Sequence, residues 1–335
     1  MLQTPGLFRT VVPIAPQNNH HALRHHEPLT LLGSCFSDSV GSRLQSYGHS
    51  TVINPLGVIY NPVSLARAVE LFSQESSIKP EDLHFCERQQ HYFSFDAGTV
   101  HCHEDADMCA EALNAAIHRG RASLESSSCL FLTLGTAWAY VRPGAGPVAC
   151  CHRQPQATFE RTLLGVDTIE SSLRSCISTA RSVNPDLRVV LTVSPVRHWR
   201  EGAVESSRSK AHLVCAAHAV CEAVPEAAYF PSYEILMDEL RDYRFYAEDM
   251  LHPSDVAIDY VTQRLLETRF DARDDHIREA VKRMRAARSH RHARPRSAAA
   301  RQFAVDHLTK VTELRDAHPY LDLEEERRHF EDLLS

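Results

Sequence analysis

Gly33, Ser34 and Cys35 are the first residues along this sequence whose types and order suit chemistry. They follow the apolar run 29–32, and apolar residues then recur at helical spacing until Gly48, so we expect a strand, a tight turn and a helix. The unpaired N–H groups and the dipole at the start of a helix favour a thiolate or an oxyanion. Cys35 therefore has the position expected of a nucleophile.

A second pair, Asp249 and His252, has the spacing of a carboxylate and the histidine that it orients. A nucleophilic thiol needs a base, and a histidine held in one tautomer by a carboxylate supplies both proton transfer and orientation. The D-x-x-H pattern alone arises by chance in many proteins. Its place in the last loop before a helix, combined with Cys35 after the first strand, is a more specific signal.

Further polar residues follow the other apolar runs of the chain. In parallel α/β sheets ligands bind at the carboxyl ends of the strands, so such residues are the candidates for the remainder of the site. The candidates are Asn54, Gly57, Thr136, Trp138, Arg197 and His198.

Three cationic or aromatic side chains have plainer interpretations beside a functional one. His198 could bind a carboxylate, a phosphate or an acyl donor, or it could be satisfied by a neighbouring carbonyl group. Lys210, expected near the start of a helix on the same sheet edge, suits an anionic ligand, although most such lysines face solvent. Trp138 could form a wall of a ligand site or cap the core.

Strands and helices alternate along the first 270 residues. Continuous β-rich runs at 130–134 and 189–193 are typical of strands covered on both faces. Helical patterns near 105–119, 166–183 and 207–223 fill the spaces between the strands. We therefore predict an α/β fold built on a three-layer, doubly wound parallel sheet.

Two additions to this sheet are expected. Alternating apolar and polar residues from Asp82 to His103, around Asp96-Ala-Gly98, predict an inserted antiparallel β-hairpin. After Phe270 the composition changes to Arg, His and Ala, which indicates a helical C-terminal extension. We therefore predict a main domain over residues 1–270 and an extension over residues 271–335.

The composition limits which classes of partner and which cellular locations we expect for this protein. A formal net charge of −7 and a pI near 6.3 give no overall drive toward nucleic acid, and the basic run 283–294 is more simply a solvated helix face. No stretch approaches 18 apolar residues, and the N-terminus lacks an apolar run long enough for a signal peptide. We expect a cytoplasmic protein with a small-molecule or protein partner and no membrane association.

The ten cysteines include no C-x-x-C pair, and most lie in apolar segments, so we expect buried, reduced thiols. Cys150, Cys151 and His152, together with His101 and His103, are the zinc ligands that could be considered. They lack the spacing of common zinc motifs, and we therefore expect no metal site.

The segment 31–37, Leu-Leu-Gly-Ser-Cys-Phe-Ser, resembles the motif that names the GSCFA family. The resemblance extends over roughly residues 10–330, and its last long segment is highly specific. The other segments that carry it are 53–62, 135–138, 151–152, 194–198, 209–211, and 229–234 leading into 246–253.

Membership would imply the layout of SGNH/GDSL hydrolases, an SGNH/flavodoxin-like sheet with a nucleophile in G-D-S after the first strand and D-x-x-H near the domain's end. Laying Gly33-Ser34-Cys35 over that triplet puts Cys35 at the nucleophile position. In a shifted register Ser34 attacks and Cys35 packs. In a third interpretation both are small residues that permit a tight turn.

The sequence also departs from the SGNH pattern. Those enzymes carry an oxyanion-hole Asn in G-x-N-D, whereas this chain reads Gly-Thr-Ala-Trp at 135–138. The hole would then need the backbone N–H groups of Cys35 and Gly57, helped by Asn54 or Thr136. A family-like Asn-Cys-His-Lys segment reads Cys-Cys-His-Arg at 150–153, which makes His152 a further candidate for substrate binding.

The resemblance implies an acyl esterase or an acyl (acetyl) transferase that acts on a carbohydrate or another polar acceptor. No cofactor is required, and acyl-coenzyme A is the donor expected for the transferase version, which Arg197 and Lys210 would suit. The alternative is a catalytically silent SGNH-like module that recruits a protein partner through its extension. The sequence predicts no oligomeric state.

Overall fold

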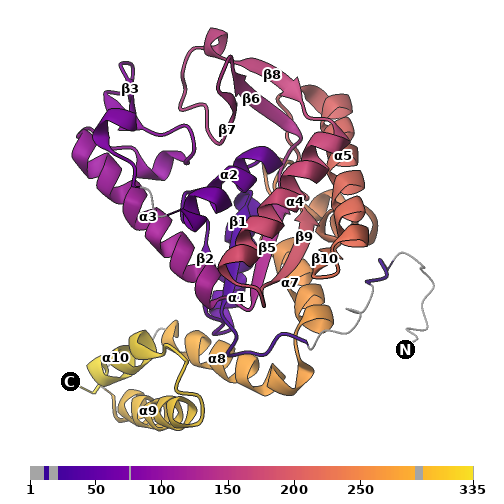
Figure 1. Cartoon of the computed structure of the whole chain (residues 1–335). Helices are drawn as coiled ribbons and strands as arrows, with labels where there is room; N and C mark the ends of the chain where they lie inside the picture. The colour runs from indigo at the N-terminus through magenta and orange to yellow at the C-terminus, as the bar shows by residue number, and fades with distance from the viewer. Residues whose placement is uncertain (1–10, 15–21, 75–76, 291–296, 335) are drawn as a thin grey trace.

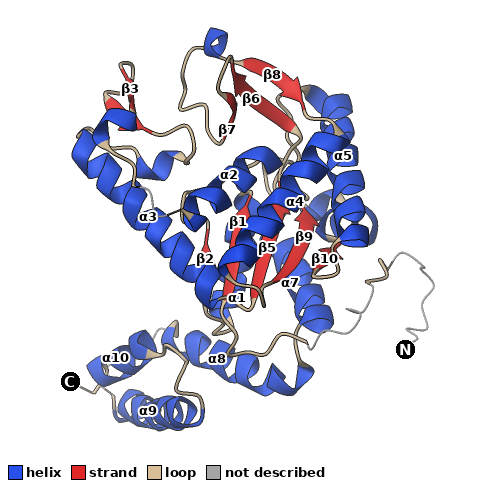
Figure 2. Cartoon of the chain, viewed as in Figure 1, coloured by secondary structure: helices blue, strands red, loops and turns tan. Residues whose placement is uncertain are grey.

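The structure, a computed structural model, describes residues 11–14, 22–74, 77–290 and 297–334. Its centre is a parallel sheet of five strands (Figures 1 and 2), in the order β10-β9-β5-β1-β2. The strands are β1 (Leu29–Gly33), β2 (Thr51–Ile53), β5 (Cys129–Leu134), β9 (Arg188–Val193) and β10 (Ala227–Phe230).

Helices cover both faces of the sheet, because alternate residues of the buried strands point to opposite sides. Leu130 and Leu132 of β5 belong to a core shared with four helices, whereas Cys129 and Phe131 belong to a core shared with two others. The first group is α2 (Pro62–Ser73), α3 (Ala106–Ser126), α4 (Val166–Val183) and α5 (Gly202–Ala223), and the second is α1 (Cys35–Ser46) and α7 (Asp255–Arg269). The three-layer α/β prediction is confirmed.

The strand order reverses between β1 and β5. From β1 the chain steps outward to β2, and it then returns to the other side of β1 to form β5, β9 and β10 in turn. This is the flavodoxin-like order of a doubly wound sheet, in which the carboxyl ends of the two strands at the reversal diverge and leave a crevice. The residues that follow β1 and β5 are therefore placed to line a ligand site.

The predicted hairpin is present as β3 (His84–Cys86) and β4 (His91–Phe93), but its turn lies at residues 87–90. The prediction that the chain reverses at residues 96–98 was wrong. There, Gly98 N–H donates to Leu56 O (2.7 Å) and so connects this segment to the loop after β2. Gln90, at φ 53°, closes the actual turn.

A second, three-stranded antiparallel sheet is present that was not predicted from the sequence. It consists of β6 (Trp138–Arg142), β7 (Gly146–Val148) and β8 (Glu160–Leu163), and it stands above the carboxyl ends of the central strands in Figure 2. After β10 the chain forms the short α6 (Ser232–Glu234) and a π-helical turn (Ile235–Glu239). No helix within the described ranges is long and apolar enough to cross a membrane.

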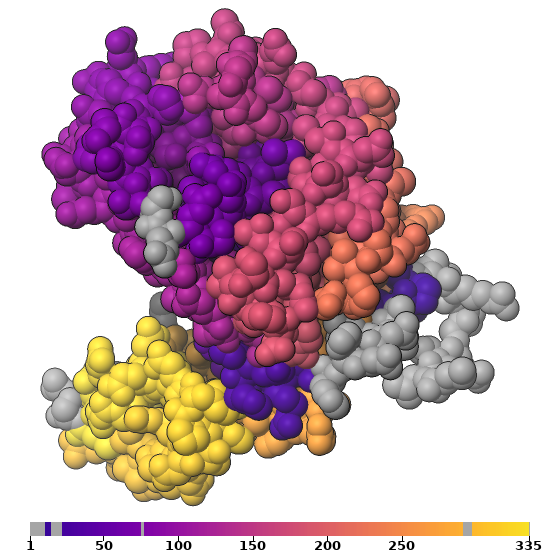
Figure 3. Space-filling view, in the orientation of Figure 1, coloured from indigo at the N-terminus to yellow at the C-terminus, as the bar shows by residue number. Residues whose placement is uncertain are grey.

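The C-terminal extension is helical, as predicted, with α8 (Asp275–Arg288), α9 (Ala298–Ala317) and α10 (Glu324–Asp332) around a core of their own. It forms a distinct lobe at the end of the sheet opposite β6–β8 (Figures 1 and 3). The guanidinium of Arg285 donates to Gln45 O at the end of α1, which joins this lobe to the sheet domain. The domain boundary after residue 270 stays a prediction.

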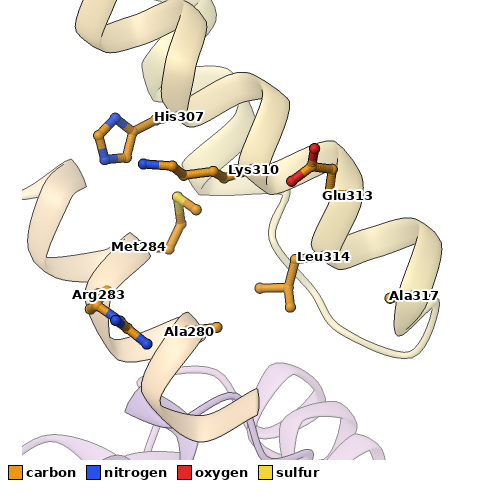
Figure 4. Close-up of a pocket in the computed structure, with 8 residues that line it drawn as sticks. All are labelled: Ala280, Arg283, Met284, His307, Lys310, Glu313, Leu314 and Ala317. Atoms are coloured by element: carbon orange, nitrogen blue, oxygen red, sulfur yellow. The ribbon is translucent and has the colours of Figure 1, made fainter. Parts of the chain in front are cut away.

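The basic run of the extension is largely paired with acidic groups where it is described. Arg285 and Arg288 both form ion pairs with Glu326, while residues 291–296 lie outside the described residues. A groove of about 470 Å³ between α8 and α9 is lined by Met284, His307 and Lys310 (Figure 4). It lies in the extension, away from every candidate catalytic residue.

Candidate active site

A cavity of about 400 Å³ lies at the carboxyl ends of β1, β5 and β9. This is the position at which open α/β sheets bind ligands, beside the reversal of strand order. Six of the predicted site residues line it, namely Cys35, Thr136, Trp138, Arg197, His198 and His252.

The turn that carries Cys35 is fixed by the neighbouring strand. Gly33 has φ +137°, and a Cβ there would lie 2.1 Å from Thr133 O, so only glycine fits. Ser34 is fully buried and is the N-cap of α1, because its Oγ accepts from Phe36 N (3.3 Å) and its N–H donates to Thr133 O (3.1 Å). Cys35 is the residue of the turn whose side chain faces the cavity.

The thiol of Cys35 is only partly favoured as a thiolate. Burial raises its pKa above the ordinary thiol value, and the Asp38 carboxylate in the first turn of α1 raises it further. The N–H groups of Cys35 and Phe36 and the ammonium of Lys210 act in the opposite direction. The helix start therefore stabilises the anion, as expected, but burial outweighs this effect.

Asp249 and His252 form a locally built pair. The Nδ1 atom of His252 lies 2.6 Å from Asp249 Oδ2, while Asp249 Oδ1 accepts from the N–H groups of Leu251 and His252 (both 2.9 Å). These backbone bonds, with the imidazole contact, lower the pKa of Asp249 to about 2. A carboxylate at Nδ1 leaves Nε2 of His252 available for proton transfer.

A backbone contact anchors this loop beside the cavity. Arg197 N–H, after β9, donates to Leu251 O (3.1 Å), and Met250 has φ 59°, which bends the chain so that His252 can face inward. Both Cys35 and His252 line the cavity, yet among the hydrogen bonds of the described residues none joins them. In uncomplexed enzymes such contacts are often long and tighten on substrate binding.

Asn54 and Gly57 were expected at the site, but neither of them lines the cavity. Asn54 accepts from Gly33 N (2.8 Å) and donates to Asp38 Oδ1 (2.8 Å), so its side chain braces the turn beneath Cys35. The N–H of Gly57 donates to Asn54 O (2.7 Å) and is not free to bind an oxyanion. The expectation that both belong to the oxyanion hole is therefore corrected, because each polar group already has a partner in the turn.

Thr136 and Trp138 do line the cavity. The Oγ1 of Thr136 contacts Ser209 Oγ (3.0 Å) and accepts from Trp138 N (3.0 Å), which fixes the chain as it leaves β5. The indole Nε1 of Trp138 reaches Glu205 O (3.4 Å), and the ring forms part of the cavity wall. Trp138 is thus placed as a wall, and Thr136 is mostly committed to the loop.

The three predicted cationic or imidazole side chains have different environments. Arg197 lines the cavity with its guanidinium 5.6 Å from the Trp199 ring. Burial lowers the pKa of His198 to about 3, and its Nε2 is buried without a partner among the described residues. A neutral imidazole with an unmet hydrogen-bonding atom at the cavity is a candidate ligand-binding group.

Lys210 does not face a ligand. It is 2% exposed, and its Nζ donates to Gly135 O and Ser194 O (both 2.6 Å), the residues that follow β5 and β9. Burial lowers its pKa to about 7. The expectation of an anion-binding lysine is corrected, because the side chain joins two strand ends behind the cavity and can affect Cys35 only through its charge.

His152 also lies outside the cavity. It is 1% exposed and stacks on Phe93 of β4, with ring centroids 4.3 Å apart. Its Nε2 contacts Ala97 O (3.0 Å) and its Nδ1 contacts Cys102 Sγ (3.5 Å). The expectation that it binds substrate is corrected, because it is buried under the hairpin.

Sequence analysis missed several residues that line the cavity. Tyr60, Cys150 and Cys151 do so, and they lie in or beside the segments that carry the family resemblance, which was the available signal. Arg161 comes from β8, a strand that was not predicted, whereas Arg200 lies two residues after the predicted site residue His198. Arg161 pairs with Glu201 (2.7 Å), and its guanidinium also lies 4.3 Å from the Tyr140 ring.

Comparison with solved structures gives distant similarities. A protein provisionally assigned as a platelet activating factor from Streptococcus pneumonia is 14% identical, with TM-score 0.37, over 72% of this chain and 82% of that one. A Clostridium thermocellum family 3 carbohydrate esterase is 10% identical, with TM-score 0.33, over 76% and 98%. The acetyl xylan esterase Est2A from Butyrivibrio proteoclasticus is 10% identical, with TM-score 0.35, over 72% and 62%.

Comparison with protein families, in contrast, identifies the family of this chain. No curated protein matches this chain. The GSCFA family matches residues 28–265, which include both Cys35 and His252, and the C-terminal domain of GSCFA domain proteins matches residues 281–335. Since the first match alone spans well over half of the sequence, the chain belongs to the GSCFA family.

Proposed function

We propose that this protein is an acyl esterase or acyl transferase that uses Cys35 as its nucleophile. His252 Nε2 takes the thiol proton as Cys35 Sγ bonds to the carbonyl carbon of the substrate. The bond to the leaving atom, the oxygen of an ester or the sulfur of acyl-coenzyme A, then breaks, and that atom receives the proton from His252. Water or an acceptor hydroxyl, deprotonated by His252, next attacks the thioester, and Cys35 leaves as the thiolate and regains its proton.

The observation that carries this proposal is the shared cavity. Cys35 follows β1 and His252 lies more than 200 residues later, yet both line the same hollow, and Asp249 holds His252 Nδ1 at 2.6 Å. A nucleophile, a base and a carboxylate that orients the base are the parts that acyl transfer requires. The location at the reversal of strand order supports the same conclusion.

The oxyanion would be stabilised by the start of α1. The first N–H groups of a helix have no intrahelical partners, and the N–H of Cys35 already acts on its own thiol. The N–H of Phe36 is capped by Ser34 Oγ (3.3 Å), so the Cys35 N–H is the main donor there. Gly57 cannot contribute its N–H, because that group already donates to Asn54 O. The oxyanion hole therefore depends on the start of α1, unless Thr136 reorients to donate to the substrate. We expect modest turnover for this reason.

The cavity wall favours a polar acceptor with flat faces, such as a carbohydrate. Tyr60, Trp138, Tyr140 and Trp199 supply aromatic surface, and Arg197 supplies a cation close to Trp199. Aromatic rings stack on sugar faces, and guanidinium groups bind carboxylate or phosphate. Acyl-coenzyme A would serve as donor in the transferase version, whereas the hydrolase version needs only water.

Two observations favour the alternative, a catalytically silent binding module. The pKa of Cys35 is raised, and no hydrogen bond joins its thiol to His252 among the described residues. A module of this kind would keep the cavity to bind a ligand and would leave acyl groups unchanged.

The test is acylation of the purified protein by p-nitrophenyl acetate and by acetyl-coenzyme A, followed by intact mass. We expect one acetyl adduct that is lost in Cys35→Ala and retained in Cys150→Ala, a matched thiol of the same cavity. Loss in Ser34→Ala, with the adduct retained in Cys35→Ala, would show that the hydroxyl attacks in a shifted register. An unmodified wild type with no release of p-nitrophenol would support the silent module.

A further inference from the structure

We propose that His91, Cys102 and His152 form a transition-metal site, most suited to zinc, within the hairpin lobe, which comprises residues 84–103 and the segment 148–152 that packs against them. Among the described residues these three are the group whose ligand atoms lie close enough to bind one ion, all within 4.8 Å of one another. Two imidazoles and a thiolate are the donors that zinc prefers. The site is separate from the cavity of Cys35, which none of the three residues lines.

The spacing of the donor atoms suits tetrahedral coordination. With metal–ligand bonds of about 2.0–2.3 Å, two ligand atoms of a tetrahedral zinc site lie about 3.3–3.8 Å apart. His152 Nδ1 and Cys102 Sγ are already 3.5 Å apart. The remaining pairs, within 4.8 Å, need to close by only about 1 Å, which small side-chain rotations supply.

The tautomer of His152 is fixed in the form that binds metal. Its Nε2 lies 3.0 Å from Ala97 O, which can only accept, so Nε2 carries the proton and Nδ1 offers a lone pair toward Cys102. A histidine ligand that donates its other ring N–H to a backbone carbonyl is the usual outer-sphere arrangement at metal sites. Stacking on Phe93, at 4.3 Å between centroids, holds the ring in place.

His91 supplies an unused donor atom. The Nε2 atom of His91 is buried and has no hydrogen-bond partner among the described residues, although His91 as a whole is only partly buried in the hairpin. A buried polar atom without a partner is costly unless something else binds it. The bridge between Tyr92 and His103 brings β4 alongside the segment of Cys102, so the backbone already presents the two ligands together.

A bound ion would join β4, the segment of Cys102 and the segment of His152. The apolar cluster of this lobe is small, with Cys86, Phe93, Phe95 and Val148 as its buried members. His152 directly follows Cys150 and Cys151, which line the catalytic cavity, so the ion would also fix that wall. Binding would release the Cys102 thiol proton to solvent.

The experiment uses the full chain, purified under reducing conditions, loaded with Zn²⁺ and dialysed. We expect one zinc per chain by elemental analysis, and with Co²⁺ the absorption bands of a tetrahedral site with a thiolate ligand. His91→Ala should lose the metal without unfolding, since its Nε2 has no partner within the described part of the chain. Cys102→Ser should lose both the metal and the thiolate band. Zinc should raise the melting temperature of the wild type but not that of His91→Ala or Cys102→Ser.

Cys109→Ser is the matched control. Its thiol is buried on α3 beside the hairpin lobe and lies within hydrogen-bond distance of Tyr92 O (3.4 Å) and His101 O (3.2 Å), so this variant should keep the metal. A wild type that retains no zinc and shows no cobalt bands would overturn the proposal. So would unchanged metal content in a folded His91→Ala variant, or equal loss from Cys109→Ser.

Discussion

The two halves of the candidate active site are built in opposite ways. The Cys35 turn is buried and held by distant parts of the chain, with Ser34 bonded to Thr133 and Gly33 bonded to Asn54. The Asp249–His252 pair is half exposed and is held mainly within four residues, through three hydrogen bonds to one carboxylate. The turn that carries the nucleophile thus packs against the core, whereas the base lies in a loop on the surface of the domain.

This difference has a consequence for mutation. A change at the base loop should remove chemistry and leave the fold, because the side chains there stabilise little else. A change at the nucleophile turn should damage the fold as well, because β1, β5 and α1 meet there. Mutations in the base loop should therefore reduce activity without reducing stability, whereas mutations in the nucleophile turn should reduce both.

The largest expected effect is on activity at the base. His252→Ala should lower the rate of p-nitrophenyl acetate hydrolysis about 10²–10⁴-fold, because no other group would take the thiol proton. The melting temperature should stay close to that of the wild type, since His252 is half exposed. Tyr243→Ala, an exposed residue of the same loop, is the control and should keep full activity. Equal losses in the two variants would mean that the loop acts only through its conformation.

The next effect is on stability at the nucleophile turn. Gly33→Ala should lower the free energy of unfolding by about 3 kcal/mol or more, because the new Cβ would meet Thr133 O at 2.1 Å in a backbone conformation that alanine disfavours. Gly144→Ala, at φ +75° with open space around it, isolates the conformational cost and should lose about 1 kcal/mol. Denaturant unfolding measures both, and similar losses would mean that the turn can relax.

The smallest effect concerns the charge beside the thiol. Asp38 raises the pKa of Cys35, so removing its charge should lower that pKa and increase the thiolate fraction at neutral pH. Asp38→Asn should therefore speed alkylation of Cys35 by iodoacetamide roughly two- to fivefold at pH 7. The rate should rise with pH in both proteins, and the mid-point should be lower in the variant. The exposed Cys215 serves as the internal control, and equal acceleration there would exclude a local charge effect.

The elements of the central sheet were predictable because each is encoded locally. The runs 51–53 and 166–183 coincide with β2 and α4, since their apolar periodicity is uninterrupted and turn residues bound them. The sheet of β6, β7 and β8 was not predicted, because its short half-buried strands have no comparable pattern. The hairpin turn was placed at the wrong residues because Gly98 is needed for a close approach to Gly57 rather than for reversing the chain.

The sequence by itself determined the family, the alternation of strands and helices, and the local Asp249–His252 pair, because these depend on neighbouring residues. Only the tertiary structure decided which polar residues share the cavity. Asn54 and Gly57 follow a strand at the expected edge, and Lys210 lies within α5, but their polar groups bond to backbone and side chains inside the fold. Arg161 enters the cavity from a strand that sequence analysis did not predict. Proximity to a strand end is a local property, whereas the direction of a side chain is set by the hydrogen bonds that distant segments offer it.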